Sequence, residues 1–81
     1  MSIMESRPFS THSEAIRRKI ATQFQTIYPE YSIDTVEAVF SHVNPGTWWN
    51  HETSEWDVWS AYRASFEKKL KTMPKIVEEV G

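Results

Sequence analysis

Apolar residues early in the chain recur at the spacing of an α-helix. They stand at Ile16, Ile20, Phe24 and Ile27. Intervals of three and four residues put all of them on one helical face. The stretch Thr11-His12-Ser13-Glu14 in front of them matches a capping box, in which the first and last side chains satisfy each other's backbone amides. Because Pro29 cannot continue the pattern, the spacing predicts a helix over residues 12–28.

A second apolar pattern of this kind covers the next segment. Its apolar positions are Ile33, Val36, Val39, Phe40 and Val43. The capping box Asp34-Thr35-Val36-Glu37 and helical spacing favour a helix at residues 35–43. Val36, Ala38 and Phe40 also alternate as they would in a strand, so both structures stay open for this segment. Asn44-Pro45-Gly46 ends it in either case.

The longest apolar pattern lies in the second half of the chain. Its positions are Trp59, Tyr62, Phe66, Leu70 and Met73. Acidic Glu55 and Asp57 precede it, and lysines cluster at its end, an order that suits the helix dipole. This predicts a third helix over residues 54–72, with residues 44–53 as the connection and a break at Pro74. Ile76, Val77 and Val80 then predict a short fourth helix or a docked tail.

These patterns together predict an all-α fold, a compact three-helix domain with a short C-terminal helix or docked tail. Residues 1–10 read as a flexible N-terminal tail, and residues 11–81 as a single helical domain. The expected core consists of Ile16, Ile20, Phe24, Val39, Phe40, Trp59, Tyr62, Phe66 and Leu70.

Composition argues against an enzyme. The chain has no Cys and only two Gly, which excludes disulfides, thiolate metal sites and a glycine-rich phosphate loop. His12, His42 and His51 lack the spacing that puts two ligands on one helix face. We therefore expect no catalytic residue, no cofactor and no metal.

Charge and hydropathy narrow the choice of partners and location. The net charge of −2 gives no general attraction to nucleic acid. No apolar run has the length of a membrane span, and the N-terminus lacks the apolar section of a secretion signal. These features, with the lack of Cys, favour the cytoplasm. The run Arg17-Arg18-Lys19 leaves a nucleic-acid-binding regulator as the alternative, although three consecutive residues fan around a helix.

Four tryptophans lie close together, at Trp48, Trp49, Trp56 and Trp59. Trp48 and Trp49 are consecutive, so their side chains diverge in any regular backbone, and one core cannot readily take both. Exposed Trp is enriched among the residues that dominate protein interfaces. We therefore predict a protein-binding surface at Trp48 or Trp49, with a polar rim of Asn50, His51 and Glu52. The alternative, in which all four tryptophans serve the core, remains open.

The Trp48-Trp49 pair, a polar gap and then Trp56-x-x-Trp59-x-x-Tyr62 resemble a pattern in small phage and prophage accessory proteins, over residues 47–63. The resemblance implies a bacterial or phage accessory role, often in binding a host protein. The leading hypothesis is a small non-catalytic helical protein-protein interaction module that acts as an inhibitor or adaptor and is a possible homodimer. A purely structural domain of a larger complex is a further alternative.

Overall fold

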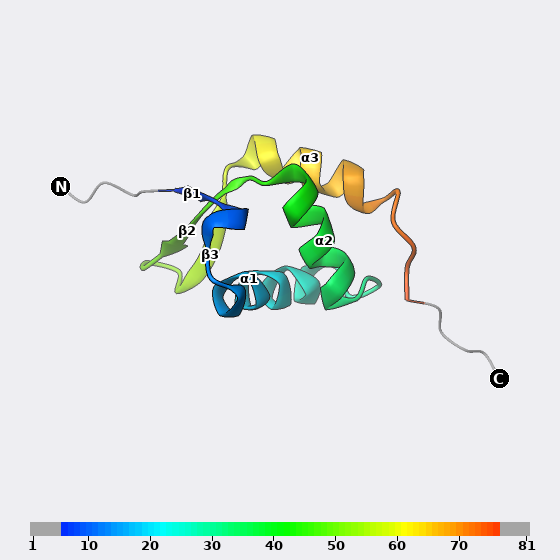
Figure 1. Ribbon diagram of the computed structural model, residues 1–81, viewed down its shortest axis with the longest axis horizontal. Coiled ribbons are helices and arrows are strands. Elements are labelled where there is room, and N and C mark those ends of the chain that lie inside the picture. Colours follow the sequence, from blue (N-terminus) through cyan, green and yellow to red (C-terminus); the bar gives the residue numbers. More distant parts are fainter. Residues whose placement is uncertain (1–5, 77–81) are drawn as a thin grey trace.

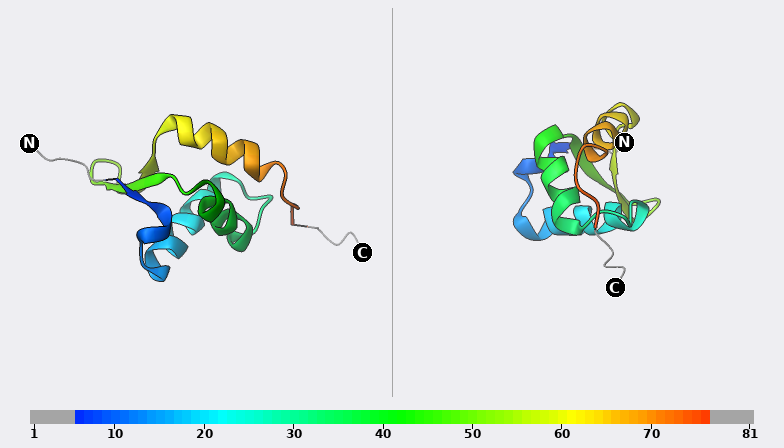
Figure 2. Two further views of the ribbon diagram at one scale, coloured as in Figure 1. Left: turned by 45° about the horizontal axis from the view of Figure 1, so that its top comes forward. Right: turned by 90° about the vertical axis from the view of Figure 1, so that its right-hand side faces the viewer.

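The computed structural model describes residues 6–76, which form three helices and a three-stranded antiparallel sheet (Figure 1). In chain order the elements are β1 (Arg7–Pro8), the short 3-10 helix η1 (Phe9–Thr11), α1 (Glu14–Ile27), α2 (Ile33–Val43), β2 (Gly46–Asn50), β3 (Glu55–Val58) and α3 (Ser60–Leu70). The all-α prediction is therefore wrong, because both strands of a hairpin lie in the Trp-rich region. The hairpin of β2 and β3 extends away from the helices (Figures 1 and 2).

The first two helices confirm the periodic apolar pattern, and residues 35–43 are helix rather than strand. Each helix begins at a serine cap. The Ser13 hydroxyl accepts the Ile16 amide at 3.3 Å, and the Ser32 hydroxyl accepts the Thr35 amide at 3.1 Å. The predicted capping boxes, which used Thr11 and Asp34, therefore misplaced the first turn by about two residues. The αL conformation of Asn44, with φ of 50°, ends α2.

The predicted third helix at residues 54–72 is wrong over its first turns. The segment 55–58 is strand β3, Trp59 is extended in front of the helix, and α3 runs only from Ser60 to Leu70. Glu55-Trp56-Asp57-Val58 alternates polar and apolar residues, and Trp and Val favour strands. The apolar spacing that predicts this helix includes Trp59, but the helical backbone begins only at the next residue, Ser60.

Part of the segment expected to be only a connection, residues 44–53, pairs with β3 to form the hairpin. In the register of β2 and β3, Trp49 lies opposite Trp56 and Trp48 lies opposite Asp57. β1 adds to the other side of β2, with Arg7 opposite Thr47.

A four-residue turn at residues 51–54 joins the two strands. The Asn50 side-chain oxygen accepts the amides of Glu52 at 2.9 Å and Thr53 at 3.3 Å, which closes the start of the turn. Ser54 completes it at a positive φ of 55°.

Phenylalanine rings form the centre of the core. Phe40 stacks on Phe9 with ring centroids 4.9 Å apart and contacts Phe24 and Phe66 at 4.9 and 4.5 Å. Phe9 is fully buried, and its amide donates to the Pro45 carbonyl at 2.9 Å. Residues 7–10, expected in the tail, are therefore part of the folded domain. This core joins η1 to all three helices.

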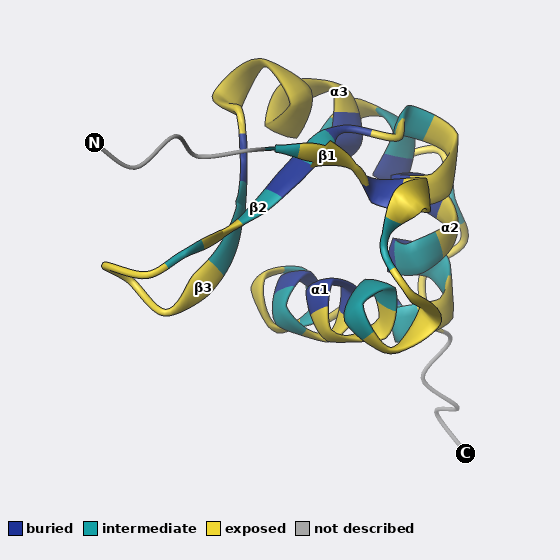
Figure 3. Cartoon of the chain, turned by 60° about the vertical axis from the view of Figure 1, so that its left-hand side comes forward, coloured by how far each residue is buried: buried dark blue, intermediate teal, exposed yellow. Residues whose placement is uncertain are grey.

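Most of the expected core is buried: Ile20, Phe24, Val39, Phe40, Phe66 and Leu70. Ile16 is partly buried against that cluster. The prediction is wrong for Trp59, which is 57% exposed, and for Tyr62, which is 36% exposed. Trp59 directly precedes α3 and Tyr62 lies on its first turn, which stands at the surface together with the hairpin tip (Figure 3).

At the C-terminal end, the Ile76 amide donates to the Glu30 carbonyl at 2.8 Å. The other residues of the expected fourth helix or docked tail, Val77 and Val80, lie outside the described range. Among residues 6–76, no helix has the length and apolar character needed to cross a membrane.

Candidate functional site

The two consecutive tryptophans point to opposite faces of the sheet, as alternation along a strand requires. Trp49 is 39% exposed, and its ring meets the Trp56 ring edge to face, with centroids 5.6 Å apart. Trp48 lies on the other face, opposite Asp57, and is half-buried. Its indole N–H is buried without a hydrogen-bond partner among residues 6–76. Packing rather than hydrogen bonding therefore holds the Trp48 ring within this range.

Gln23 of α1 fixes the backbone of Trp56. Its side-chain amide donates to the Trp56 carbonyl at 2.7 Å and accepts the Trp56 amide at 2.7 Å. The Gln23 side chain thus takes the place of a neighbouring strand at the outer edge of β3. The next outward amide, of Val58, donates to the Asp57 carboxylate at 2.8 Å. These two contacts close an edge that would otherwise be open to another strand.

His12 also contacts the Trp56 ring. The two rings meet edge to face at 5.3 Å, and His12 Nε2 is hydrogen-bonded to Thr47 Oγ1 at 2.6 Å. Burial lowers the pKa of His12 below its usual value of 6.5; the hydrogen bond to Thr47 opposes this shift, and the nearby charge of Arg7 adds to it. The lowered pKa favours the neutral imidazole. Through Thr47 and Trp56, His12 links the segment after η1 to the hairpin.

The predicted binding residues fall into two groups. Trp49, Asn50, His51 and Glu52 follow one another along the outer part of the hairpin, and His51 and Glu52 are exposed in its turn. Asn50 is half-buried, and its side chain is used within the turn. Trp48 is on the opposite face, so the structure separates it from the surface around Trp49.

The basic run of α1 does not form one patch. Arg18 pairs with Asp34 at 2.6 Å and with Glu37 at 3.4 Å, both on α2. Arg17 reaches the Ser10 carbonyl at 3.5 Å, in a different direction. Lys19 is exposed and lies one helical turn before Gln23, on the side of α1 that faces the hairpin. The three cationic side chains therefore lie in three different parts of the surface.

Two aromatic features were missed because they depend on the hairpin. Trp56 packs against the edge of the core and is also a direct neighbour of Trp49 across the hairpin; the polar-apolar alternation of residues 55–58 indicates this strand. Trp59 and Tyr62 stack on each other at 5.8 Å on the exposed start of α3. The two hydrogen bonds from Gln23 to the Trp56 backbone, which we call the Gln23 clamp, could not be predicted from the sequence because they join residues 33 positions apart.

A cleft of about 270 Å³ lies where the α1–α2 connection meets the end of α3. Tyr28 Oη donates to Glu67 at 2.9 Å inside it, and burial followed by this contact raises the pKa of Tyr28 to about 12. Glu30, Lys71 and Lys75 also line the cleft, so carboxylates and amines are mixed there. The Tyr28 hydroxyl therefore keeps its proton and donates a structural hydrogen bond to Glu67; it is not activated as a base.

Comparison with protein-family models, curated proteins and solved structures finds no match for this chain. Within residues 6–76, no group of three or more His, Asp or Glu side chains is arranged to hold a metal ion. The case for function therefore depends on the surface around Trp49.

Proposed function

We propose that this chain is a small non-catalytic protein-binding module that contacts its partner through the outer part of the β2–β3 hairpin. Trp49 forms the centre of the contact surface, His51 and Glu52 of the turn form its polar rim, and Asn50 supports that rim by closing the turn from the opposite face. An inhibitor or adaptor role in the cytoplasm fits such a module, because it needs a surface and no reaction centre.

The observation that carries this proposal is an exposed tryptophan on a rigid support. Trp49 leans on Trp56, and Gln23 holds the Trp56 backbone through two hydrogen bonds of 2.7 Å. A side chain fixed before binding loses little conformational freedom in the complex. Large aromatic anchors of this type supply much of the binding free energy at interfaces.

The nucleic-acid alternative receives less support. Phosphate binding needs several cations on one surface. Arg18 is paired with two carboxylates, Arg17 reaches the Ser10 carbonyl, and Lys19 lies on the hairpin side of α1, so the three cations do not share one surface. The resemblance of residues 47–63 to phage and prophage accessory proteins supports a host protein as the partner. A second copy of this chain is the other possible protein partner, and molar mass in solution distinguishes the two.

The experiment is quantitative affinity capture from the native cell with tagged wild type, Trp49→Ala and Trp59→Ala. Trp59 is the matched control, since it is even more exposed but lies outside the hairpin, directly before α3. We expect a protein that is retained by wild type and Trp59→Ala and lost with Trp49→Ala. If both variants retain the same proteins as wild type, the surface around Trp49 is not the binding site.

A further inference from the structure

The two faces of the three-stranded sheet carry different charges. On one face the register groups Arg7, Thr47, Trp49, Trp56 and Val58. The other face carries Trp48 and Asn50, together with the acidic pair Glu55 and Asp57. The strand residues around Trp49 and Trp56 thus include a cation and no acid, although the whole chain has a net charge of −2.

Further cations border this aromatic face, which we define as Trp49, Trp56 and the adjoining His12. Arg7 is exposed on the same side of the sheet as Thr47, whose hydroxyl contacts His12. Lys19 lies on the hairpin side of α1, one turn before the Gln23 that binds Trp56. Cations from two elements, β1 and α1, therefore flank the aromatic face.

The acidic residues of the first two helices lie elsewhere. Glu14, Asp34 and Glu37 line a separate groove between α1 and α2, where Arg18 pairs with the last two. The pairing satisfies these carboxylates locally, away from the hairpin. The acids of the hairpin itself are Glu52, in the turn at the opposite end of β2 from Arg7, and Glu55 and Asp57, which by alternation lie on the other face of the sheet.

We infer that the partner presents an acidic peptide segment to this surface, with an apolar side chain against Trp49 and carboxylates toward Arg7 and Lys19. This inference rests on the proposed function and names the chemistry of the partner. Complementary charge steers association and rejects partners of the wrong sign. Desolvation beside the indole rings strengthens the charge contacts relative to those in open water.

The mode of contact follows from the strand edges. Gln23 occupies the outward amide and carbonyl of Trp56, and Asp57 accepts the outward amide of Val58, which opposes the addition of a partner strand at that edge of β3. On the β3 side of the hairpin, contact is therefore left to the side chains of the sheet face. Single-stranded nucleic acid fits this face less well, because it requires a continuous basic track as well as stacking surfaces.

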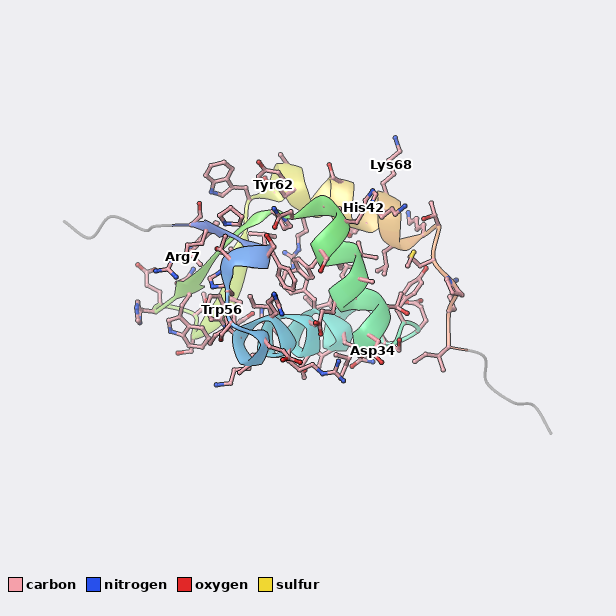
Figure 4. The ribbon with its side chains drawn as sticks, in the orientation of Figure 1. Arg7, Asp34, His42, Trp56, Tyr62 and Lys68 are labelled. Atoms are coloured by element: carbon pink, nitrogen blue, oxygen red, sulfur yellow. The ribbon has the colours of Figure 1, made fainter. Side chains whose placement is uncertain are left out.

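The test is selection from a displayed library of random short peptides on immobilised wild-type protein, with Trp49→Ala protein as the subtractive control. Selected peptides are then titrated against wild type, Arg7→Glu, Lys19→Glu and Lys68→Glu. Lys68 is the control because its reversal makes the same change in net charge at a distant site on α3 (Figure 4). Circular dichroism checks the folding of every variant, and a thymidine oligonucleotide is titrated in parallel.

We expect the selected peptides to be rich in Asp and Glu around an apolar residue. Their affinity should fall about tenfold or more with Arg7→Glu or Lys19→Glu, and little with Lys68→Glu. Higher salt should weaken binding, because exposed charges are screened.

Neutral or basic peptides that still require Trp49 would overturn the acidic-partner inference and leave the proposed function standing. The same holds for peptides that are insensitive to Arg7→Glu and Lys19→Glu. Failure to select any peptide that distinguishes wild type from Trp49→Ala would also overturn the inference. Oligonucleotide binding that needs both Trp49 and Arg7 would replace the acidic peptide with nucleic acid and count against the proposed function.

Discussion

The phenylalanines and the tryptophans of this chain occupy different regions. All four phenylalanines, Phe9, Phe24, Phe40 and Phe66, are at most 1% exposed and pack together. None of the four tryptophans belongs to that core: two are half-buried and two are exposed. Phe can be buried without a hydrogen-bond partner, whereas the indole N–H of Trp needs one. Only Trp49 and Trp59 are therefore available for contact, whereas Trp56 packs against the edge of the core and the Trp48 indole N–H is buried.

This division implies that substitutions in the two regions have different consequences. The phenylalanine core joins η1, α1, α2 and α3, so its loss affects the whole domain. The hairpin joins the core near its base, where Val58 is buried and Trp56 packs against the cluster, and Gln23 and His12 add polar and aromatic contacts. Changes on its exposed face should alter binding while the fold persists.

The largest effect is expected at Phe40, whose ring contacts those of the other three phenylalanines directly. Phe40→Ala should lower the free energy of unfolding by about 3–5 kcal/mol, through lost apolar burial and a cavity. Losses of that size approach the total stability of many small domains. Urea unfolding followed by circular dichroism measures it, with Phe40→Leu as the milder control. A loss below about 1 kcal/mol would contradict the claim that the phenylalanine core stabilises the domain.

A smaller effect is expected at Gln23. Gln23→Ala leaves the amide and carbonyl of Trp56 without their side-chain partners, which should cost about 1–3 kcal/mol. Gln23→Glu is the matched control, because its carboxylate can still accept the amide but cannot donate to the carbonyl. Hydrogen exchange of the Trp56 amide and urea unfolding are the measurements. Unchanged protection of this amide in Gln23→Ala would show that the clamp does not hold the hairpin.

His12 should make stability depend on pH. Its pKa is lowered in the folded protein, so the unfolded chain binds the proton more tightly. Stability should therefore be constant above about pH 6.5 and decline as the pH falls from there through the lower pKa of the folded state. Urea midpoints across this range test the effect. His12→Gln should flatten the decline, with His51→Gln as the control substitution; an unchanged slope in His12→Gln would contradict the assignment.

The parts of the fold that sequence predicts well are those with local causes. α1 and α2 follow from apolar spacing and nearby capping serines, which act within one or two turns. The hairpin was missed because short strands are stabilised mainly by partners across the sheet, here Trp49 against Trp56. The same helical stripe correctly located Phe66 and Leu70 but failed at Trp59, where α3 had not yet begun.

The candidate site was predictable in composition but not in geometry. Consecutive tryptophans had to diverge, which singled out the Trp48-Trp49 pair. Which of them stays exposed depends on the register with β3 and on packing around the sheet. The supporting roles of His12 and Gln23 arise only when α1 and the hairpin come together in the folded protein.

The most direct test of the central claim measures stability and binding on the same preparations of Trp49→Ala. The partner isolated by wild type is titrated against wild type, Trp49→Ala and Trp59→Ala after urea unfolding of each. Trp49→Ala should unfold within about 1 kcal/mol of wild type and bind the partner at least tenfold more weakly, whereas Trp59→Ala should change neither property much. Trp49→Ala that binds as wild type does, or that loses binding only because it unfolds, would contradict the claim that Trp49 acts in binding rather than in the fold.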